Sequence, residues 1–477
     1  MTLSLLTREQ IQRIHDDSMK LLCEIGMQYH HPDAIELVKA NGVHVEGDTA
    51  FWTEAQVMEW ISYAPSSFTL YARNPNHNVV MGEGHTHFAP SYGFPSTIDE
   101  NGQTTPGTIS DYVEFVKLFQ ANDDFDINGG LIIQPNDVNV GTSNLSMLYA
   151  ALVGSDKAQI VVGEGTADQF DVMMKVMAET VGGMDYLKEH PCMITIVDVM
   201  TPLQFSGHMT ETLFKFAEYG QAMAITSCAM AGTTAPVTTI SPLVYNNAEV
   251  ISTIALAQMV RKGAPVMYGN QSLQSDMATG GVACGAPESA LIYAYGADMA
   301  NFYNLPYRAG GAVTDSKFIN FQAGMESMIT LLSTAMSGAN LIIHSAGTMD
   351  SYISTSKEKV LADFEICKYV RKMITPAIVD DETIPLDLYR EIGHDGTYLA
   401  EDHTLEHCNE PVKPMVGIRG GKYAEDPTKA RLAAYRAKLL DAYSKPTLSP
   451  DVLERMKSIL VEAGVPRETL ELIDSLY

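Results

Sequence analysis

The sequence predicts an α/β protein built on a (β/α)8 TIM barrel, with an α+β cap before the barrel and a helical extension after it. Eight short apolar runs, each closing on a small or polar residue, recur between positions 87 and 347. Most gaps between them suit one amphipathic helix and two loops, the alternation that a parallel sheet requires. The alternative, an open doubly wound sheet, would usually carry a glycine-rich phosphate loop after its first strand, and HFAPSYGFPS (87–96) is not such a loop.

Residues 1–85 are expected to form the α+β cap over one end of the barrel. Helices are predicted over 7–24, 33–41 and 53–63. FTLYAR (68–73) and NVVMG (78–82), separated by a turn rich in Asn and Pro, predict a hairpin. A separate small domain is the alternative reading of this segment.

The barrel itself is predicted over 86–375 and the helical extension over 376–477. The predicted strand runs are 87–93, 127–135, 158–165, 192–199, 222–232, 265–272, 306–317 and 340–347. The predicted barrel helices are 109–120, 143–154, 167–180, 206–219, 246–262, 286–303, 320–337 and 358–374. In the extension, charge-rich helices are predicted over 427–443, 449–463 and 466–475, where they would pack outside the barrel.

Composition excludes several classes of protein. A net charge of −27 argues against nonspecific nucleic-acid binding and against anionic membrane surfaces. No apolar stretch approaches the roughly 20 residues that span a bilayer, and the N-terminus lacks the features of a signal peptide. The six cysteines are scattered without a CxxC pair, which indicates a reducing cytoplasm. A symmetric homo-oligomer is expected, because large soluble barrels often associate.

Chemistry in such a barrel sits at the C-terminal ends of the strands, so the residues that close each run are the candidates. Zinc would need three or four converging His, Cys or carboxylate ligands. Glu164, Asp198, Cys228 and His344 lie near strand ends but include no closely spaced pair, so no metal ligand is assigned. Neither a G-x-S-x-G elbow nor a P-loop occurs.

Aromatic side chains at the strand ends predict a cage for a cation. The ring would comprise Tyr92, Phe94, Phe205, Tyr268 and Tyr352. Such a cage attracts a quaternary ammonium through cation–π contacts of about 0.5–2 kcal/mol each, and Arg308 would pair with a carboxylate on the same ligand. The alternative is that these aromatics are packed core.

Three long blocks of sequence resemble one known family. They are CGAPESALIYAYGADMANFYNLPYRAGGAVTDSKFINFQAGMES (284–327), GANLIIHSAGTMDS (338–351) and IGHDGTYLAEDHTLEH (392–407). Over nearly its whole length the chain resembles the trimethylamine methyltransferase superfamily. The resemblance implies a (β/α)8 barrel that moves a methyl group from a methylamine or quaternary amine to the cobalt of a separate corrinoid protein. Because the chain has no pyrrolysine, it resembles the branch whose characterised members demethylate betaines, such as glycine betaine, proline betaine and carnitine.

Chemistry explains why a pyrrolysine-free member would take a quaternary amine. When Co(I) attacks a methyl group of a quaternary ammonium, the leaving group is a neutral tertiary amine that needs no proton. A neutral methylamine would have to leave as an amide anion and therefore needs prior activation. The protein's task is then positioning and exclusion of water rather than acid–base catalysis.

We therefore predict a cytoplasmic quaternary amine (betaine):corrinoid protein methyltransferase, with no catalytic residue and no metal assigned. Substrate binding is assigned to Tyr92, Phe94, Phe205 and Tyr268 around the ammonium head, and to Gln271, Arg308 and His344 for the carboxylate. No cofactor is expected to bind tightly, because the acceptor is the corrinoid (cobalamin) of a cognate protein that docks transiently over a partly apolar rim. The alternatives are a zinc-dependent corrinoid methyltransferase of the methanol or thiol type and a non-catalytic betaine-binding protein.

Overall fold

Eight parallel strands stand at the centre of the computed structural model, which describes residues 3–99, 101–394 and 396–477. They are β6 (His87–Phe88), β9 (Ile127–Gly129), β10 (Ala158–Val161), β11 (Met193–Val199), β13 (Ala222–Ser227), β15 (Val266–Asn270), β18 (Tyr307–Gly310) and β19 (Leu341–Ile343). The strands pair in the order β6-β19-β18-β15-β13-β11-β10-β9, and the Asp126 N–H donates to the Phe88 carbonyl across the remaining gap, at 3.3 Å. Each strand lies inside its predicted run, so the predicted barrel is confirmed.

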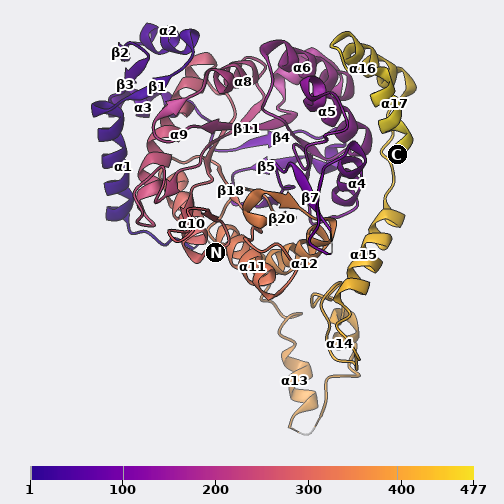
Figure 1. Ribbon diagram of the computed structural model, residues 1–477. Helices are drawn as coiled ribbons and strands as arrows, with labels where there is room; N and C mark the ends of the chain where they lie inside the picture. The colour runs from indigo at the N-terminus through magenta and orange to yellow at the C-terminus, as the bar shows by residue number, and fades with distance from the viewer. Residues whose placement is uncertain (1–2, 100, 395) are drawn as a thin grey trace.

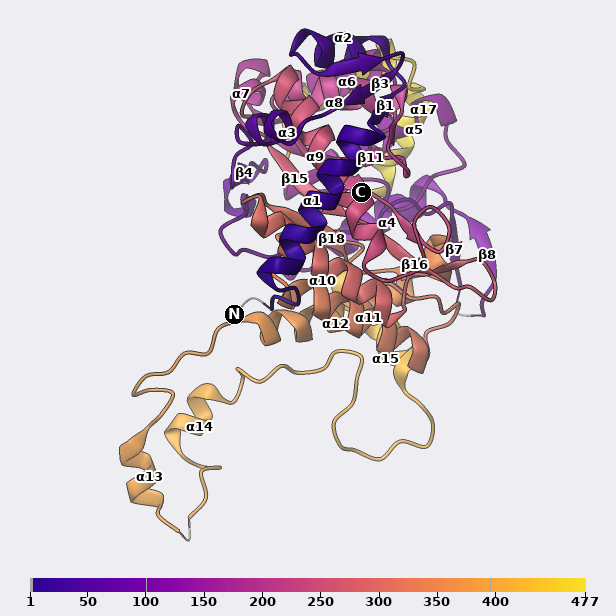
Figure 2. The same cartoon turned by 90° about the vertical axis from the view of Figure 1, so that its left-hand side faces the viewer.

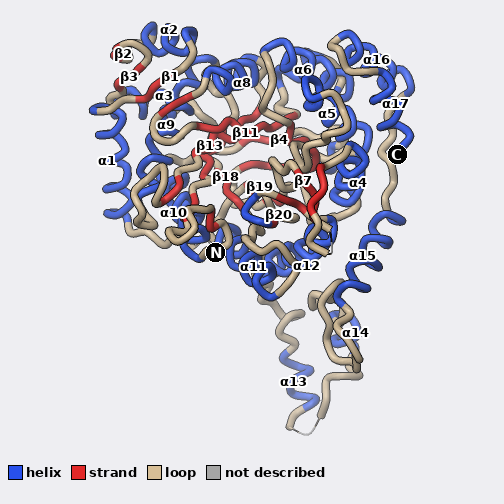
Figure 3. Tube along the Cα trace, viewed as in Figure 1, coloured by secondary structure: helices blue, strands red, loops and turns tan. Residues whose placement is uncertain are grey.

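Helices surround this barrel, as Figures 1 and 3 show. They are α4 (Ile109–Gln120), α5 (Ser143–Gly154), α6 (Ala167–Val181), α8 (Gly207–Glu218), α9 (Ser241–Val260), α10 (Pro287–Phe302), α11 (Phe321–Met336) and α12 (Lys357–Ile374), with the short α7 (Met184–Glu189) after α6. Capping boxes at Thr108 and Thr166 set where α4 and α6 begin. Helix α9 begins at Ser241 rather than at 246, with Pro242 in the first turn, where its missing N–H costs nothing.

The segment before the barrel covers one end of the barrel and one side. The hairpin β4 (Phe68–Leu70) and β5 (Val79–Met81) places Leu70, Val79 and Met81 among the apolar side chains at the N-terminal end of the barrel interior. The helices α1 (Arg8–Glu24), α2 (Pro32–Ala40) and α3 (Glu54–Ile61) instead pack on α9. Beside them, β1 (Met27–Tyr29), β2 (His44–Glu46) and β3 (Thr49–Phe51) form a small sheet with β12 (Gln204–Phe205).

Short strands that the periodicity did not predict lie in the loops after barrel strands. One small sheet joins β7 (Ser96–Ile98), β8 (Thr104–Pro106), β20 (Thr348–Met349) and β21 (Ser354–Thr355). A second joins β14 (Met230–Ala231), β16 (Leu273–Ser275) and β17 (Val282–Ala283). Because both sheets come from βα loops, they belong to the C-terminal end of the barrel, where function is expected.

The C-terminal extension packs on the barrel helices, and an arm projects before it. Helices α15 (Thr428–Ala442), α16 (Pro450–Glu462) and α17 (Arg467–Leu476) contact α4, α5, α6 and α12. The arm carries α13 (Leu386–Ile392) and α14 (Asp402–His407) away from the body, as Figures 1 and 2 show. The carboxylate of Glu365 ties down its base by accepting the N–H groups of Met415, Val416 and Gly417. Across the described residues, no helix is both long and apolar enough to cross a bilayer.

Candidate active site at the barrel mouth

Strand alternation decides which side chains face the barrel axis, because residues two apart share a face of the strand. On β11, Ile194 and Ile196 belong to the interior cluster, so Asp198 continues that face at the C-terminal end. On β18, Tyr307 and Ala309 face the helices, so Arg308 between them faces inward. The same alternation brings Cys228 and Gln271 inward after β13 and β15, where Ala224 and Met267 face the interior. We call the space between these strand ends the mouth.

Arg308 is a buried cation with free hydrogen-bonding capacity. Its side chain is 1% exposed, and within the described residues Nε and Nη1 have no hydrogen-bond partner. Burial lowers the pKa of the guanidinium, while the nearby Asp198 raises it. Because buried donors without acceptors cost free energy, this pair of N–H groups indicates a site for an acceptor from a ligand, such as a carboxylate.

Two carboxylates open onto the same mouth. Glu164, shortly after β10, and Asp198, near the end of β11, are both exposed. Protein surrounds Asp198 on its other sides, so burial raises its pKa to about 6, Arg308 opposes the rise and Glu164 adds to it. Cys228 also opens onto the mouth, and burial by the protein on its other sides, together with Asp198, raises the pKa of its thiol to about 12. The mouth therefore holds negative charge close to the cationic Arg308.

His344 is a neutral imidazole with a defined tautomer. Burial, and secondly Arg308, lower its pKa well below the ordinary value. Its Nδ1 accepts the N–H of Tyr92 at 3.3 Å, which leaves the proton of the neutral ring on Nε2. The rings of Phe94 and Tyr352 meet the imidazole edge to face, with centroids 6.3 and 5.0 Å away. His344 is therefore held as a hydrogen-bond donor.

Tyr92 forms a further wall of the mouth. Its ring is half-buried, and its hydroxyl accepts the N–H of Gly163 at 3.2 Å. Asp198, Glu164 and Arg308 all act on its pKa, which burial raises above the ordinary value. Tyr92 therefore lies among the charged groups of the mouth.

Another wall of the mouth is a polar cluster around Gln271. Its Nε2 donates to the hydroxyls of Tyr352 at 2.6 Å and Tyr293 at 2.9 Å, and those hydroxyls are 3.2 Å apart. Within the described residues, the Oε1 of Gln271 has no partner. Tyr352 has a φ of +72°, in the left-handed region that costs an L-residue about 1–2 kcal/mol. Like Arg308, this wall has a polar atom without a partner, and it also has a residue in a strained backbone conformation. Strained residues gather at functional sites.

Comparison with known proteins identifies the family. The model of the trimethylamine methyltransferase (MTTB) family matches residues 1–461. This chain belongs to the trimethylamine methyltransferase family. It is 34% identical to a glycine betaine methyltransferase of Desulfitobacterium hafniense strain Y51 over 97% of both chains. It is 29% identical to the trimethylamine methyltransferase MttB of Desulfitobacterium hafniense strain DSM 10664 / DCB-2, over 97% of this chain and 95% of that protein.

A solved structure supports the fold independently. The monomethylamine methyltransferase MtmB of Methanosarcina barkeri superposes with a TM-score of 0.54, over 92% of this chain and 88% of that one. At 10% sequence identity the likeness concerns the fold alone. The resemblance to the trimethylamine methyltransferase superfamily and the barrel fold are thus both confirmed.

The sequence of this trimethylamine methyltransferase family member predicted seven substrate-binding residues. Five of them lie together. They are Tyr92, Phe94, Gln271, Arg308 and His344. Among them, Phe94 is fully buried behind His344. It therefore packs against the imidazole and does not itself line the mouth.

Phe205 and Tyr268 do not join that group. Phe205 lies in β12 and packs edge to face on Tyr29 at 6.2 Å. Tyr268 points from β15 toward α9, where its hydroxyl bonds the side chains of Asn246 and Asn247, both at 3.1 Å. Both faces of a barrel strand are buried, so the apolar pattern of VMYGN does not reveal which side chains point inward. We therefore leave both residues out of the site.

Tyr293 and Glu249 were missed because they lie on helices rather than at strand ends. Glu249 reaches from α9 under the loops after β11 and β13, where it accepts the N–H of Leu203 at 2.7 Å and the hydroxyls of Thr201 and Ser227. Burial raises its pKa to about 7. The sequence signal for Glu249 is that it is the one acidic residue in the otherwise mostly apolar segment AEVISTIALA (248–257). Within the described ranges, no three His, Cys, Asp or Glu side chains group as a metal ion would require.

Proposed function

We propose that this protein takes a methyl group from a betaine and transfers it to the cobalt of a separate corrinoid protein. The observation that carries the proposal is the buried guanidinium of Arg308, with Nε and Nη1 unpartnered at the mouth. A betaine carboxylate would accept a charge-assisted hydrogen bond from this guanidinium, an interaction stronger than a hydrogen bond between neutral groups. The glycine betaine methyltransferase that resembles this chain supports the same assignment.

The charges of the mouth match both ends of a betaine. Asp198 and Glu164 supply negative charge for the quaternary ammonium. The rings of Tyr92 and Tyr352 add aromatic faces, which attract such cations by about 0.5–2 kcal/mol each. Arg308 and the Nε2–H of His344 would hold the carboxylate. A simple methylamine would leave the buried guanidinium unpaired, which favours a substrate with a carboxylate.

The transfer needs no proton from the protein. The C–N bond breaks with its electron pair going to nitrogen, so the product is a neutral tertiary amine, and the methyl group passes to cobalt, which changes from Co(I) to methyl-Co(III). Neutral His344 and hydrogen-bonded Gln271 fit this reaction, because they orient a ligand without ionising. The chain's contribution is to hold the methyl group in line and keep water out.

The loops around the mouth offer a surface for the corrinoid protein. Six βα loops each carry an exposed apolar side chain, namely Val140, Met200, Val237, Met277, Phe318 and Ile353. We call these residues the rim. Since the C-terminal ends of parallel strands lie at one end of a barrel, the rim surrounds the substrate site. Exposed apolar side chains on six loops around one opening offer contacts to a docking protein, and a transient partner would need only a small interface.

The test mixes the purified protein with glycine betaine and reduced cob(I)alamin and follows methylcob(III)alamin by absorbance. We expect product with glycine betaine and none with trimethylamine, which lacks the carboxylate. Betaine binding by calorimetry without product would instead identify a binding protein. Stoichiometric zinc together with methanol-dependent methylation would favour the zinc-dependent alternative. The absence of both betaine binding and methyl transfer would overturn the proposal.

A further inference from the structure

Three consecutive residues in the loop after β19 have left-handed backbone conformations. Their φ angles are 49° at Asp350, 52° at Ser351 and 72° at Tyr352. None is glycine, and such a run persists only where the surrounding structure holds it. The turn ends at Tyr352, whose hydroxyl and ring form the wall with Gln271 and His344. What holds the turn therefore decides where this wall stands.

The loop after β18 holds the turn through backbone and side-chain bonds. The Asp350 N–H donates to the Ser316 carbonyl at 3.1 Å, and the Ser351 N–H donates to the Thr314 carbonyl at 3.3 Å. The Ser351 hydroxyl donates to the Asp315 carboxylate at 2.7 Å. This last bond is the side-chain anchor at the centre of the turn.

The same carboxylate also fixes a third loop. Oδ1 of Asp315 accepts the N–H and the thiol of Cys284, each at 3.0 Å, and Oδ2 accepts the N–H of Gly285 at 3.1 Å. Asp315 thus joins the loop before α10, its own loop and the left-handed turn. It is half-buried, so these bonds are partly shielded from water.

We propose that Asp315 is a positioning residue for the betaine site. By anchoring Ser351 it keeps Tyr352 against Gln271 and His344, and so it sets substrate affinity through Tyr352. The inference rests on the proposed function for its substrate, but the geometry of the turn is testable without one.

The test compares Asp315→Asn, Ser351→Ala and the double variant, with KM and kcat measured for glycine betaine and free cob(I)alamin. We expect each single change to raise KM about tenfold with kcat within about threefold, because a wall of the site is displaced while the reacting groups stay. The double variant should be no worse than Asp315→Asn, since both changes break one anchor. Additive effects, or an unchanged KM for Asp315→Asn, would overturn the inference.

Two further variants separate positioning from general damage. Lys317→Ala removes an ion pair between the exposed Lys317, in the loop of Asp315, and Asp350 at 3.4 Å, and KM should stay within about twofold. Ser351→Gly loses the hydroxyl but accepts the left-handed backbone, so its KM should rise less than that of Ser351→Ala. Because Ser351→Ala leaves the bonds from Asp315 to Cys284 and Gly285 in place, it tests the inference even if Asp315→Asn fails to fold.

Hydrogen exchange distinguishes failure of this inference from failure of the proposed function. Amides of residues 348–355 should exchange at least about tenfold faster in Ser351→Ala than in the unaltered protein, whatever the substrate is. If the unaltered protein neither binds nor demethylates a betaine, the proposed function fails. Hydrogen exchange then still tests whether Asp315 anchors the turn. Unchanged exchange would overturn the role of Asp315.

Discussion

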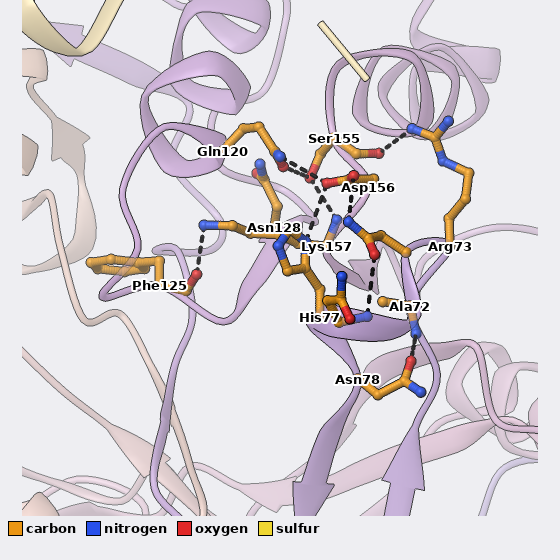
Figure 4. A network of polar contacts seen from close by, with 12 residues as sticks. Ala72, Arg73, His77, Asn78, Gln120, Phe125, Asn128, Ser155, Asp156 and Lys157 are labelled. Atoms are coloured by element: carbon orange, nitrogen blue, oxygen red, sulfur yellow. Dashed lines mark hydrogen bonds and ion pairs between the residues drawn. The ribbon is translucent and has the colours of Figure 1, made fainter. Parts of the chain in front are cut away.

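The two ends of the barrel each bury a cation, and they treat it in opposite ways. At the N-terminal end, Nζ of Lys157 donates to the carbonyls of Phe119, Asn122 and Phe125 at 2.9, 2.7 and 2.7 Å. Figure 4 shows the bond to Phe125. At the mouth, Arg308 is as deeply buried but keeps a pair of donors without a protein partner in the described chain. A buried charge whose bonds are complete stabilises the scaffold, whereas one with unpaired donors at the functional end of the barrel is a candidate for ligand binding.

The surroundings repeat this contrast. Around Lys157, Asp156 accepts from the side chain of Asn74. Figure 4 shows that Asp156 also accepts from Gln120 and that Arg73 donates to the Ser155 carbonyl. This network ties the hairpin before the barrel to the start of β10. The mouth instead carries left-handed backbone at His344 and Tyr352. The mouth thus combines left-handed backbone, at two residues whose rings are in contact with each other, with buried donors that lack a partner among the described residues.

Replacement of Lys157, the cation whose hydrogen bonds are complete, is expected to have the largest effect, and this effect is on the stability of the fold. Lys157→Met leaves three buried carbonyls without their donor, so the free energy of unfolding should fall by about 3–5 kcal/mol. The KM for glycine betaine should not change. Urea denaturation and the methyl-transfer assay measure the two quantities. A raised KM with unchanged stability would reverse the roles we give to the two ends.

The same substitution at the mouth should act on binding. Arg308→Met removes a cation that has no protein acceptor for two of its donors, so the free energy of unfolding should stay equal or rise. Affinity for glycine betaine should fall about 100-fold, as for loss of one partner of a buried charge pair. Calorimetry with glycine betaine measures the loss. Unchanged affinity would show that the carboxylate binds elsewhere.

The acidic side of the mouth should make binding depend on pH. The pKa of Asp198 is raised to about 6, mainly by burial, so its carboxyl is neutral below that pH and negative above it. Affinity for the quaternary ammonium should therefore increase as the pH rises through about 6. Asp198→Asn should flatten this profile and weaken binding about tenfold at pH 7.5. A profile that is equally steep in Asp198→Asn would assign the titration to another group.

The smallest effect is expected at the rim. Phe318→Ser should slow methyl transfer to the cognate corrinoid protein by about three- to tenfold, because one apolar contact is lost. It should leave transfer to free cob(I)alamin unchanged. Leu472→Ser, at an exposed leucine of α17 far along the chain from the βα loops, is the control and should affect neither. Equal slowing with both acceptors would place Phe318 in the substrate site instead.

Much of the fold was predictable because its signals are local. Helix α4 coincides with its predicted bounds, since Thr108 and Asp111 form a capping box ahead of an amphipathic stretch. The hairpin of β7 and β8 was not predicted, although the Asn101-Gly102 pair between the two strands is a strong turn signal. The arm between α12 and α15 was also unexpected in form, because short helices without a buried face leave little periodicity to detect.

The sequence by itself determined the alternation of strands and helices, the end of the barrel that carries function and the scarcity of paired acids and bases. Only the tertiary structure decided which side chains meet. Arg308 and Tyr268 both occupy buried strands, yet one faces the axis and the other faces α9. Strands buried on both faces are apolar throughout, so their phase is set by packing between strands and helices and not by local pattern. Whether a buried cation finds acceptors is likewise a property of neighbours distant in sequence, which is why the ammonium group of Lys157 is bonded to three carbonyls while two donors of Arg308 have no partner in the described chain.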